Sequence, residues 1–308
     1  MLSLNAGTVG LVSALAVVAV AYSVRWWTLE RARAGGMDRV SAEHSILFAQ
    51  ARTPRLTDAL VGFVTNFFDT LGIGSFAPTT AYFKLRARMP DEQIPGTLNT
   101  GQALPTMTQA LIFIATVGVD LTTLCAMILA AVLGAWFGVG LVARLSRRAI
   151  QLAMGGALLC AALLYLASNL HWMPGGGEAW GLSGAKLIVG VAVNVLLGAL
   201  MMLGVGLYAP CLILVSLLGM SPLAAFPIMM GSCALLMPVG GARFVRSGRY
   251  HLGAALGLAL GGIPGVFFAA YVVKSLPIDW LRWLVLVVAV YAALQMLRSA
   301  RLTLPTAH

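Results

Sequence analysis

The sequence predicts an all-α protein that crosses a membrane several times. Of its 308 residues, 60% are hydrophobic and 10% are charged, whereas a soluble domain carries about 45–50% apolar and about 25% charged residues. The apolar residues form blocks of roughly 20, the length of helix that crosses about 30 Å of hydrocarbon. This composition excludes a soluble globular enzyme, a disordered chain and a coiled coil. Alternating segments of about ten residues, which a membrane β-barrel needs, do not occur in the sequence.

The positions of the basic residues predict how the chain is oriented. The apolar blocks cover residues 7–29, 57–83, 97–118, 121–142, 149–169, 184–219, 222–242, 251–273 and 280–297. All lysines and arginines except Lys186, Lys274 and Arg282 lie at or after the ends of the first, second, fourth, seventh and ninth blocks. Loops rich in these residues stay in the cytoplasm. We therefore expect a multi-pass protein of the bacterial cytoplasmic membrane, with an external N-terminus and a cytoplasmic C-terminus.

Residues 1–6 carry no basic side chain, and Arg25 comes near the end of the first apolar run. A signal peptide has the reverse order, so we interpret residues 1–30 as a transmembrane helix. Residues 31–55 then form a basic cytoplasmic segment.

Two apolar blocks are predicted to be broken helical hairpins. Block 57–83 has basic loops on both sides, so it must enter from the cytoplasm and return to it. Glycines and a proline interrupt it at residues 71–78. By the same logic, block 184–219 enters from the outside and returns there, and it is interrupted at residues 203–210.

The two interruptions belong to an internal repeat with an offset of 132 residues. Identical residues at this offset are Leu71/Leu203, Gly72/Gly204, Gly74/Gly206, Ala77/Ala209, Pro78/Pro210, Pro90/Pro222 and Pro95/Pro227. We place the repeats at 56–170 and 184–308, separated by an external loop at 171–183. Each repeat is a hairpin followed by three spans, so the second is inverted relative to the first. Inverted repeats with broken helices are typical of secondary transporters.

The hairpin tips and the helix starts that follow them are the predicted binding site. Irregular backbone at membrane depth is tolerated where protein buries it or where it lines a cavity. The amino-terminal ends of half-helices offer free N–H groups to an anion. The candidate substrate-binding residues are Gly72, Gly74, Ser75, Asn99, Thr100, Gly204, Gly206, Tyr208, Gly231 and Ser232. The alternative is that the glycines only allow close helix packing and that the polar groups only join helices.

Asp69 is the only acidic residue well inside an apolar block. A carboxylate at membrane depth is costly, so it is protonated, paired or functional. We consider it a candidate for proton coupling, and the alternative is a structural carboxylate that caps the tip amides. Asp120, at an outer turn between spans, is expected to be structural.

The remaining reactive residues predict neither an enzyme nor a cofactor or metal site. Cys125, Cys160, Cys211 and Cys233 lie in apolar segments and form no CxxC pair. The four histidines lie in loops or at an end, so none is placed to activate a serine. The net charge of +10 lies in loops and follows membrane topology, so we expect no nucleic-acid partner.

The repeated motifs resemble those of the sulfite exporter TauE/SafE family, also called the 4-toluene sulfonate uptake permeases. The similar residues are Gly72-Ile73-Gly74 with Pro78, Gly204-Val205-Gly206 with Pro210, Asn99-Thr100-Gly101, Gly231-Ser232-Cys233, and Gly134 with Gly138. The resemblance covers about residues 57–300. It implies transport of small sulfur oxyanions or organosulfonates across the bacterial cytoplasmic membrane.

The sequence therefore predicts a secondary transporter of a small anion such as sulfite or a sulfonate. An anion channel, or a membrane assembly subunit without flux, remains an alternative. The expected partners are the anion and the lipid bilayer, and a homodimer is left open.

Overall fold

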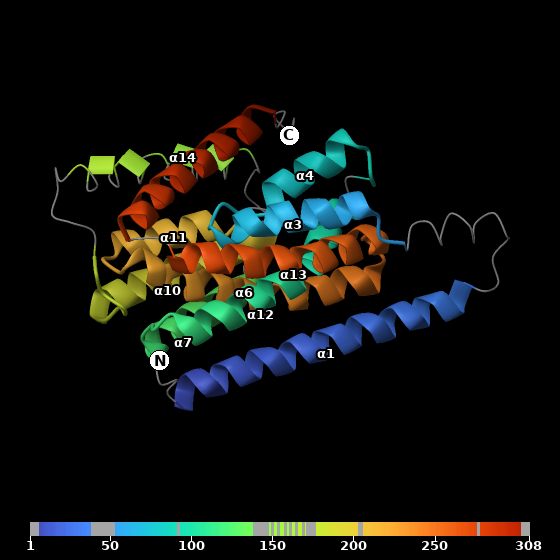
Figure 1. The fold of residues 1–308 in the computed structure, drawn as a ribbon, viewed down its shortest axis with the longest axis horizontal. Helices are drawn as coiled ribbons and strands as arrows, with labels where there is room; N and C mark the ends of the chain where they lie inside the picture. The colour runs from blue at the N-terminus through green and yellow to red at the C-terminus, as the bar shows by residue number, and fades with distance from the viewer. Residues whose placement is uncertain are drawn as a thin grey trace. The chain divides into compact units, whose positions relative to one another are not determined.

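Helices account for all the regular elements that the structure describes. The computed structural model describes residues 6–37, 53–90, 93–137, 177–202, 206–275 and 278–302, and short stretches between 148 and 170. The named helices (Figure 1) are α1 (Ala6–Met37), α3 (Leu56–Thr70), α4 (Phe76–Leu85), α5 (Ile94–Gly101), α6 (Ala103–Thr116), α7 (Leu121–Phe137), α10 (Gly184–Met202), α11 (Tyr208–Leu217), α12 (Pro222–Ser247), α13 (Leu252–Ser275) and α14 (Ile278–Leu302).

The predicted fold class, an all-α polytopic membrane protein, is confirmed. Among the residues that the structure describes, four helical stretches are long and apolar enough to cross a membrane: Ala6–Ala32, Gly184–Met201, Pro222–Ser247 and Leu252–Val272. Helix α1 continues to Met37 and so extends into the predicted cytoplasmic segment 31–55, of which residues 38–52 lie outside the described residues.

The predicted single span at 97–118 is divided into α5 and α6, which meet at Gln102. Pro105 has no N–H to donate to the Gly101 carbonyl, so the regular hydrogen bonding is interrupted there.

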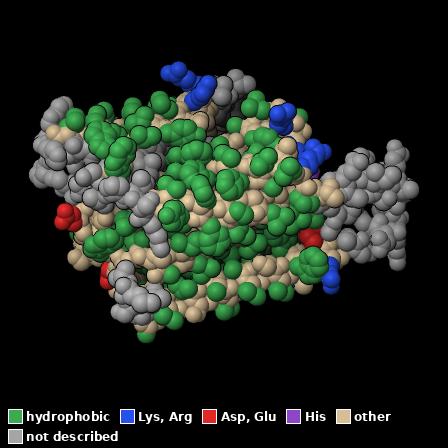
Figure 2. Space-filling view, in the orientation of Figure 1, with side chains coloured by type: hydrophobic (Ala, Val, Ile, Leu, Met, Phe, Trp, Pro, Cys, Tyr) green, Lys and Arg blue, Asp and Glu red, His purple; other side chains and the backbone are tan. Residues whose placement is uncertain are grey.

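Helix α3 has an apolar exterior and a polar interior. Leu56, Leu60, Val64 and Phe68 follow one another at four-residue spacing and are between 42% and 76% exposed. The opposite face buries Asp58, Thr65, Asn66, Asp69 and Thr70. Residues four apart lie on one face of a helix, so this amphipathic pattern is the reverse of that in a soluble protein. Hydrophobic side chains also cover most of the visible described surface in Figure 2. Such an exterior suits lipid.

The boundaries of the hairpin helices recur at the offset of the sequence repeat. Helices α3 and α10 end at Thr70 and Met202, and α4 and α11 begin at Phe76 and Tyr208, each pair 132 residues apart. Helices α4 and α11 each contain 10 residues, about 15 Å at 1.5 Å per residue, or half a bilayer core. The inverted orientation of the two repeats stays a prediction.

The helices group into two units, and each unit takes helices from both predicted repeats. Unit 1 contains Met1–Thr70, Ser75–Ala115 and Cys233–Tyr271, and unit 2 contains Leu71–Gly74, Thr116–Ser232 and Val272–His308. In unit 1, glycines at 257, 261 and 265 of α13 face α3 so closely that added Cβ atoms would collide with Asp58, Ala59 and Phe63.

In unit 2, the equivalent contact joins α7 and α10. A Cβ at Gly134 would strike the Val195 carbonyl, and one at Gly198 would strike the Ala131 carbonyl. Small residues at such positions let helix backbones approach in membranes.

The N-terminal helix α1 is held in unit 1 by a chain of buried polar contacts. The Trp26 indole donates to the Tyr250 hydroxyl at 3.0 Å, and Tyr250 donates to the Glu30 carboxylate. One turn earlier in α1, the Tyr22 hydroxyl donates to the backbone carbonyl of Thr100 on α5 at 3.3 Å. Helix α1 is thus packed against α5, which carries the predicted site residues Asn99 and Thr100.

The two ends of each hairpin lie together. In unit 1, Asp58 near the start of α3 pairs with Arg88, three residues beyond α4. In unit 2, Ala179, which precedes α10, donates to the Gly219 carbonyl at 3.3 Å and accepts from Ser221 at 2.8 Å, and these two residues follow α11. Each hairpin therefore returns to the level at which it began.

Candidate functional site

The tip of the first hairpin is a glycine turn. Gly72 and Gly74 have φ angles of 93° and 91°, in the left-handed region that glycine adopts without a steric penalty. In the second tip, Gly206 has no left-handed φ, and Gly204 lies outside the described residues. Only the first tip therefore requires glycine by its described backbone conformation.

The first tip lies beside the second hairpin within unit 2. A Cβ added at Gly72 would lie 3.3 Å from Leu212 Cδ2 and 3.8 Å from Met229 Cε. Leu212 belongs to α11 and Met229 to α12, which are both helices of the predicted second repeat. The tip thus contacts helices that follow the second interruption of the sequence.

Asp69 joins the first hairpin to α6 through hydrogen bonds. Its Oδ1 accepts from the backbone N–H of Ser75 at 2.6 Å, and its Oδ2 accepts from Gln109 Nε2 at 3.0 Å. Gln109 Nε2 also lies 3.0 Å from the Thr70 hydroxyl. Asp69 is 4% exposed. The carboxylate therefore caps the amide that precedes α4, the structural role that the sequence left open beside proton coupling.

Gln109 was missed by the sequence reasoning. It is a fully buried amide in the apolar stretch of α6. Its polarity within that stretch was the available signal, but its partner on α3 follows only from the packing.

Asn66 on α3 and Gln102 at the α5–α6 junction form a buried amide pair. Asn66 Nδ2 donates to Gln102 Oε1 at 2.6 Å and lies 2.8 Å from the Gly62 carbonyl. Both side chains are fully buried, yet Asn66 Oδ1 and Gln102 Nε2 have no hydrogen-bond partner. A buried polar atom without a partner costs about 1–3 kcal/mol. This pair therefore has one unused donor and one unused acceptor that a polar ligand could satisfy.

The predicted site residues Asn99 and Thr100 are both buried on α5. Asn99 Nδ2 donates to the Pro95 carbonyl at 2.9 Å, and Asn99 Oδ1 has no partner. The Thr100 hydroxyl also has none. By contrast, the hydroxyls of Thr65, Thr70, Thr79, Thr97 and Thr108 all donate to the carbonyl four residues earlier.

The predicted residues of the second repeat lie in unit 2. Tyr208, Gly231 and Ser232 are buried. Asn194 Nδ2 donates to the Met127 carbonyl at 2.6 Å and lies 3.4 Å from the Ser232 hydroxyl, while Asn194 Oδ1 has no partner. The structure thus brings Asp69 together with Ser75, and Asn194 with Ser232. That the two sets line one site stays a prediction.

Asp120 has the structural role expected for it. Its Oδ2 accepts from the backbone N–H and the hydroxyl of Thr123, both at 2.8 Å. This arrangement satisfies a free amide in the first turn of α7.

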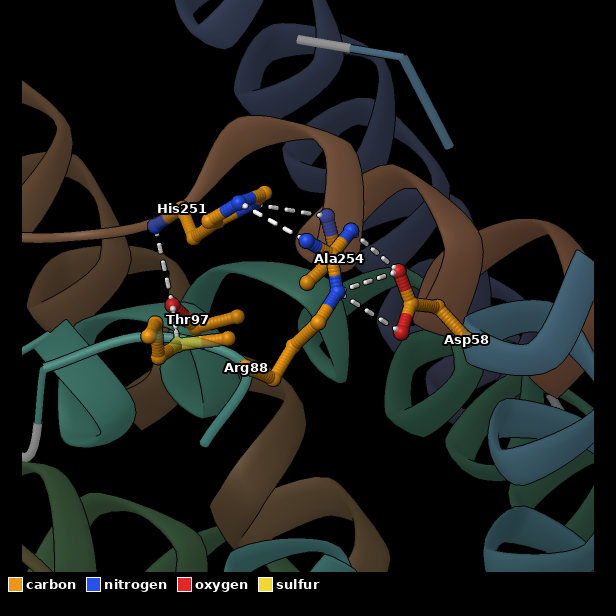
Figure 3. Close-up of polar contacts among 6 residues, drawn as sticks. Asp58, Arg88, Thr97, His251 and Ala254 are labelled. Carbon is orange, nitrogen blue, oxygen red and sulfur yellow. Dashed lines mark hydrogen bonds and ion pairs between the residues drawn. The ribbon is translucent and has the colours of Figure 1, made fainter. Parts of the chain in front are cut away.

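A second polar cluster, which the sequence reasoning missed, lies at the open end of the first hairpin (Figure 3). Arg88 Nη2 lies 2.8 Å from Asp58 Oδ2, and the two side chains are 7% and 0% exposed. Arg88 Nη1 lies 3.3 Å from His251 Nε2, and the His251 backbone N–H donates to Thr97 Oγ1 at 2.9 Å. Opposite charges near the two ends of block 57–83, with Asp58 just inside the first end and Arg88 five residues beyond the second, were the available signal.

Burial, followed by the neighbouring Arg88 guanidinium, lowers the pKa of His251 below its usual 6.5, and the Asp58 carboxylate opposes this shift. His251 precedes α13 and lies outside the spanning helices. Its neutral form therefore suits the contact with Arg88. Across the residues that the structure describes, no group of three or more His, Cys, Asp or Glu side chains is placed to hold a metal ion.

These features define a polytopic helical membrane protein with half-length hairpin helices, an apolar exterior and polar groups in its interior. The chain belongs to the sulfite exporter TauE/SafE family, a family of membrane transporters, because that family's model matches residues 1–165. The match includes α1 and the first predicted repeat up to residue 165, whereas the resemblance argued from the motifs covers about 57–300. Comparison with curated proteins and with solved structures gave no match.

Proposed function

We propose that this protein is a secondary transporter that moves a small sulfur oxyanion or organosulfonate across the bacterial cytoplasmic membrane. The observation that carries the proposal is the set of buried polar atoms without partners in unit 1: Asn66 Oδ1, Asn99 Oδ1, Thr100 Oγ1 and Gln102 Nε2. Leaving four such atoms unpaired is expensive for folding alone. A polar substrate that binds transiently would give them partners.

The chemistry of this set suits a substrate that must be released. Amide and hydroxyl groups offer hydrogen bonds without a fixed charge, so they hold an oxyanion less strongly than a lysine or arginine would. We assign the substrate contacts to Gln102 and Asn66, in addition to the predicted Asn99, Thr100 and Ser75. Gly72, Gly74, Gly204, Gly206, Tyr208, Gly231 and Ser232 complete the proposed set from the two tips and the second repeat.

We further propose that Asp69 couples transport to protons. As a carboxylate, Asp69 accepts from both the Ser75 amide and Gln109 Nε2. A proton on Oδ2 would make that oxygen a donor, so Gln109 would have to rotate or release it. Protonation would thereby change the connection between the first hairpin and α6, which follows the α5 helix that carries Asn99 and Thr100. This gives a physical route from proton uptake to the site.

The test is counterflow in proteoliposomes. Vesicles loaded with unlabelled sulfite are diluted into a trace of radiolabelled sulfite, with protein-free liposomes as the control. A carrier produces a transient uptake above the equilibrium level, whereas an open channel does not. The same vesicles are loaded with methanesulfonate and thiosulfate. Absence of transient uptake for every anion of this panel would overturn the proposal.

A further inference from the structure

The amide pair Asn66–Gln102 is joined by one hydrogen bond and leaves two buried atoms, Asn66 Oδ1 and Gln102 Nε2, without a hydrogen-bond partner. We propose that these two atoms form a subsite for a singly charged anion that carries its own proton. In the sulfur oxyanion class the fitting species is hydrogensulfite rather than the sulfite dianion. The inference rests on the proposed function and specifies the ionic form that the site accepts.

The orientation of the two amides follows from their neighbours. The Gly62 carbonyl accepts hydrogen bonds only, so the group of Asn66 that faces it at 2.8 Å must be Nδ2. The same Nδ2 lies 2.6 Å from the Gln102 side chain, which must then present Oε1. Gln102 Nε2 is left as an unpartnered donor and Asn66 Oδ1 as an unpartnered acceptor.

A ligand that satisfies both atoms must accept one hydrogen bond and donate another. Hydrogensulfite does both, because it has accepting oxygens and one proton to donate. The sulfite dianion and sulfate can only accept. A sulfonate also only accepts, although it carries the correct single charge.

The charged side chains of unit 1 also favour a singly charged ligand over a dianion. The buried ionic side chains among its described residues are Glu30, Asp58, Asp69 and Arg88, and Arg88 is already paired with Asp58. Asp69 lies three residues after Asn66 on α3, near the same helix face. The cost of burying an ion rises with the square of its charge, so a dianion needs a cation that the described residues do not offer. A monoanion needs only the neutral donors.

The first experiment measures competition for sulfite exchange in proteoliposomes between pH 6 and pH 8. Equal pH inside and outside removes any driving force from a proton gradient. The apparent affinity for total sulfite should fall as pH rises and stay constant when it is expressed as hydrogensulfite. At each pH the apparent dissociation constant of sulfite is divided by the inhibition constant of methanesulfonate, which has one charge at every pH. This ratio cancels pH effects that come from titrating groups of the protein and act on both anions. We expect hydrogensulfite to bind best, methanesulfonate more weakly and sulfate not at all.

The second experiment replaces the unpartnered donor of the pair. Gln102→Glu exchanges the free amide donor for a carboxylate and should raise the KM for sulfite by about 10- to 100-fold, the loss expected for hydrogen bonds to a charged group. The matched control is Gln295→Glu on α14, whose amide donates to Tyr291. Size-exclusion chromatography in detergent checks that each variant is folded.

The outcomes separate the two proposals. The subsite would be overturned if sulfate competed as well as hydrogensulfite. It would also be overturned if the affinity, expressed as total sulfite, did not change with pH. Either result would leave the proposed transport function intact. A folded Gln102→Glu protein with an unchanged KM would mean that the two unpartnered amide atoms bind only a structural water, which also overturns the subsite. If the unmodified protein exchanged none of the anions tested, the proposed function itself would be overturned.

Discussion

The carboxylate of Asp58 and the guanidinium of Arg88 form an ion pair, with 2.8 Å between Oδ2 and Nη2, which joins the two open ends of the first hairpin. Both side chains are buried, and the pair also contacts His251 at the start of α13. A carboxylate buried at this level would be costly without its partner. The pair therefore ties α3 and the segment after α4 to one level of unit 1.

Breaking this pair on one side should destabilise the protein strongly. We expect Arg88→Met to lower the free energy of unfolding by about 3–5 kcal/mol, because it leaves the Asp58 charge buried and unpaired. Thermal unfolding in detergent, followed by tryptophan fluorescence, measures the loss. The control is Arg86→Met, which removes an exposed charge from the same segment. The double variant Asp58→Leu with Arg88→Met should recover part of the loss, and a double variant less stable than Arg88→Met would contradict this account.

The depressed pKa of His251 predicts acid sensitivity of the same cluster. In the unfolded chain the imidazole takes up a proton near pH 6.5, whereas in the folded protein it does so only at lower pH. The stability that depends on neutral His251 is thus complete above about pH 6.5 and is lost as pH falls toward the folded pKa. Melting temperatures measured from pH 7.5 to pH 5 should fall less steeply for His251→Asn than for the unmodified protein. Parallel curves would show that His251 does not contribute.

The close packing of α7 against α10 in unit 2 should depend on the absence of a Cβ at Gly134. Gly134→Ala places a Cβ against the Val195 carbonyl of α10, so α7 and α10 must separate, at about 1–3 kcal/mol or more. Gly10→Ala is the matched control, since nothing lies within 4 Å of a Cβ added there. Both variants are compared by their melting temperatures in detergent. Equal melting temperatures would disprove the close contact.

The two hairpin tips should respond differently to the same substitution. Gly74 has a left-handed φ and open space around it, so Gly74→Ala should cost about 1–2 kcal/mol from the backbone alone. Gly206 has open space and no left-handed φ, so Gly206→Ala should leave stability within about 0.5 kcal/mol. Bulky replacements such as Gly74→Leu and Gly206→Leu should both abolish counterflow if the tips line the site. Retained counterflow in folded bulky variants would exclude the tips from it.

Replacing Asp69 tests the proton-coupling proposal. Asp69→Asn keeps an oxygen that can accept from the Ser75 amide, so the tip should remain folded. It removes the titrating group, and sulfite uptake driven by a pH gradient should lose its dependence on that gradient while exchange at equal pH continues. An Asp69→Asn protein that still responds fully to the gradient would assign coupling to another group.

The sequence determined the membrane class, the interruptions of the two hairpin blocks and the starts of most described helices to within about three residues. Apolar blocks, basic loops and the glycine–proline interruptions act within a few residues of the chain, so they can be interpreted without knowing the packing. The interruptions at Gly72 and Gly204 predicted half-helices, and α4 and α11 begin where the motifs place them. The family resemblance came from the same local motifs.

The tertiary structure decided which polar groups meet. Asp69 finds Gln109, 40 residues away, and Asn66 finds Gln102, 36 residues away. Arg88 reaches Asp58 and His251 from a segment that precedes α5. It also decided that α3 packs against α13 and that α7 packs against α10, helices taken from different predicted repeats. These partnerships depend on how closely glycine-bearing faces of distant helices approach, and a local pattern of apolar and charged residues carries no information on that distance.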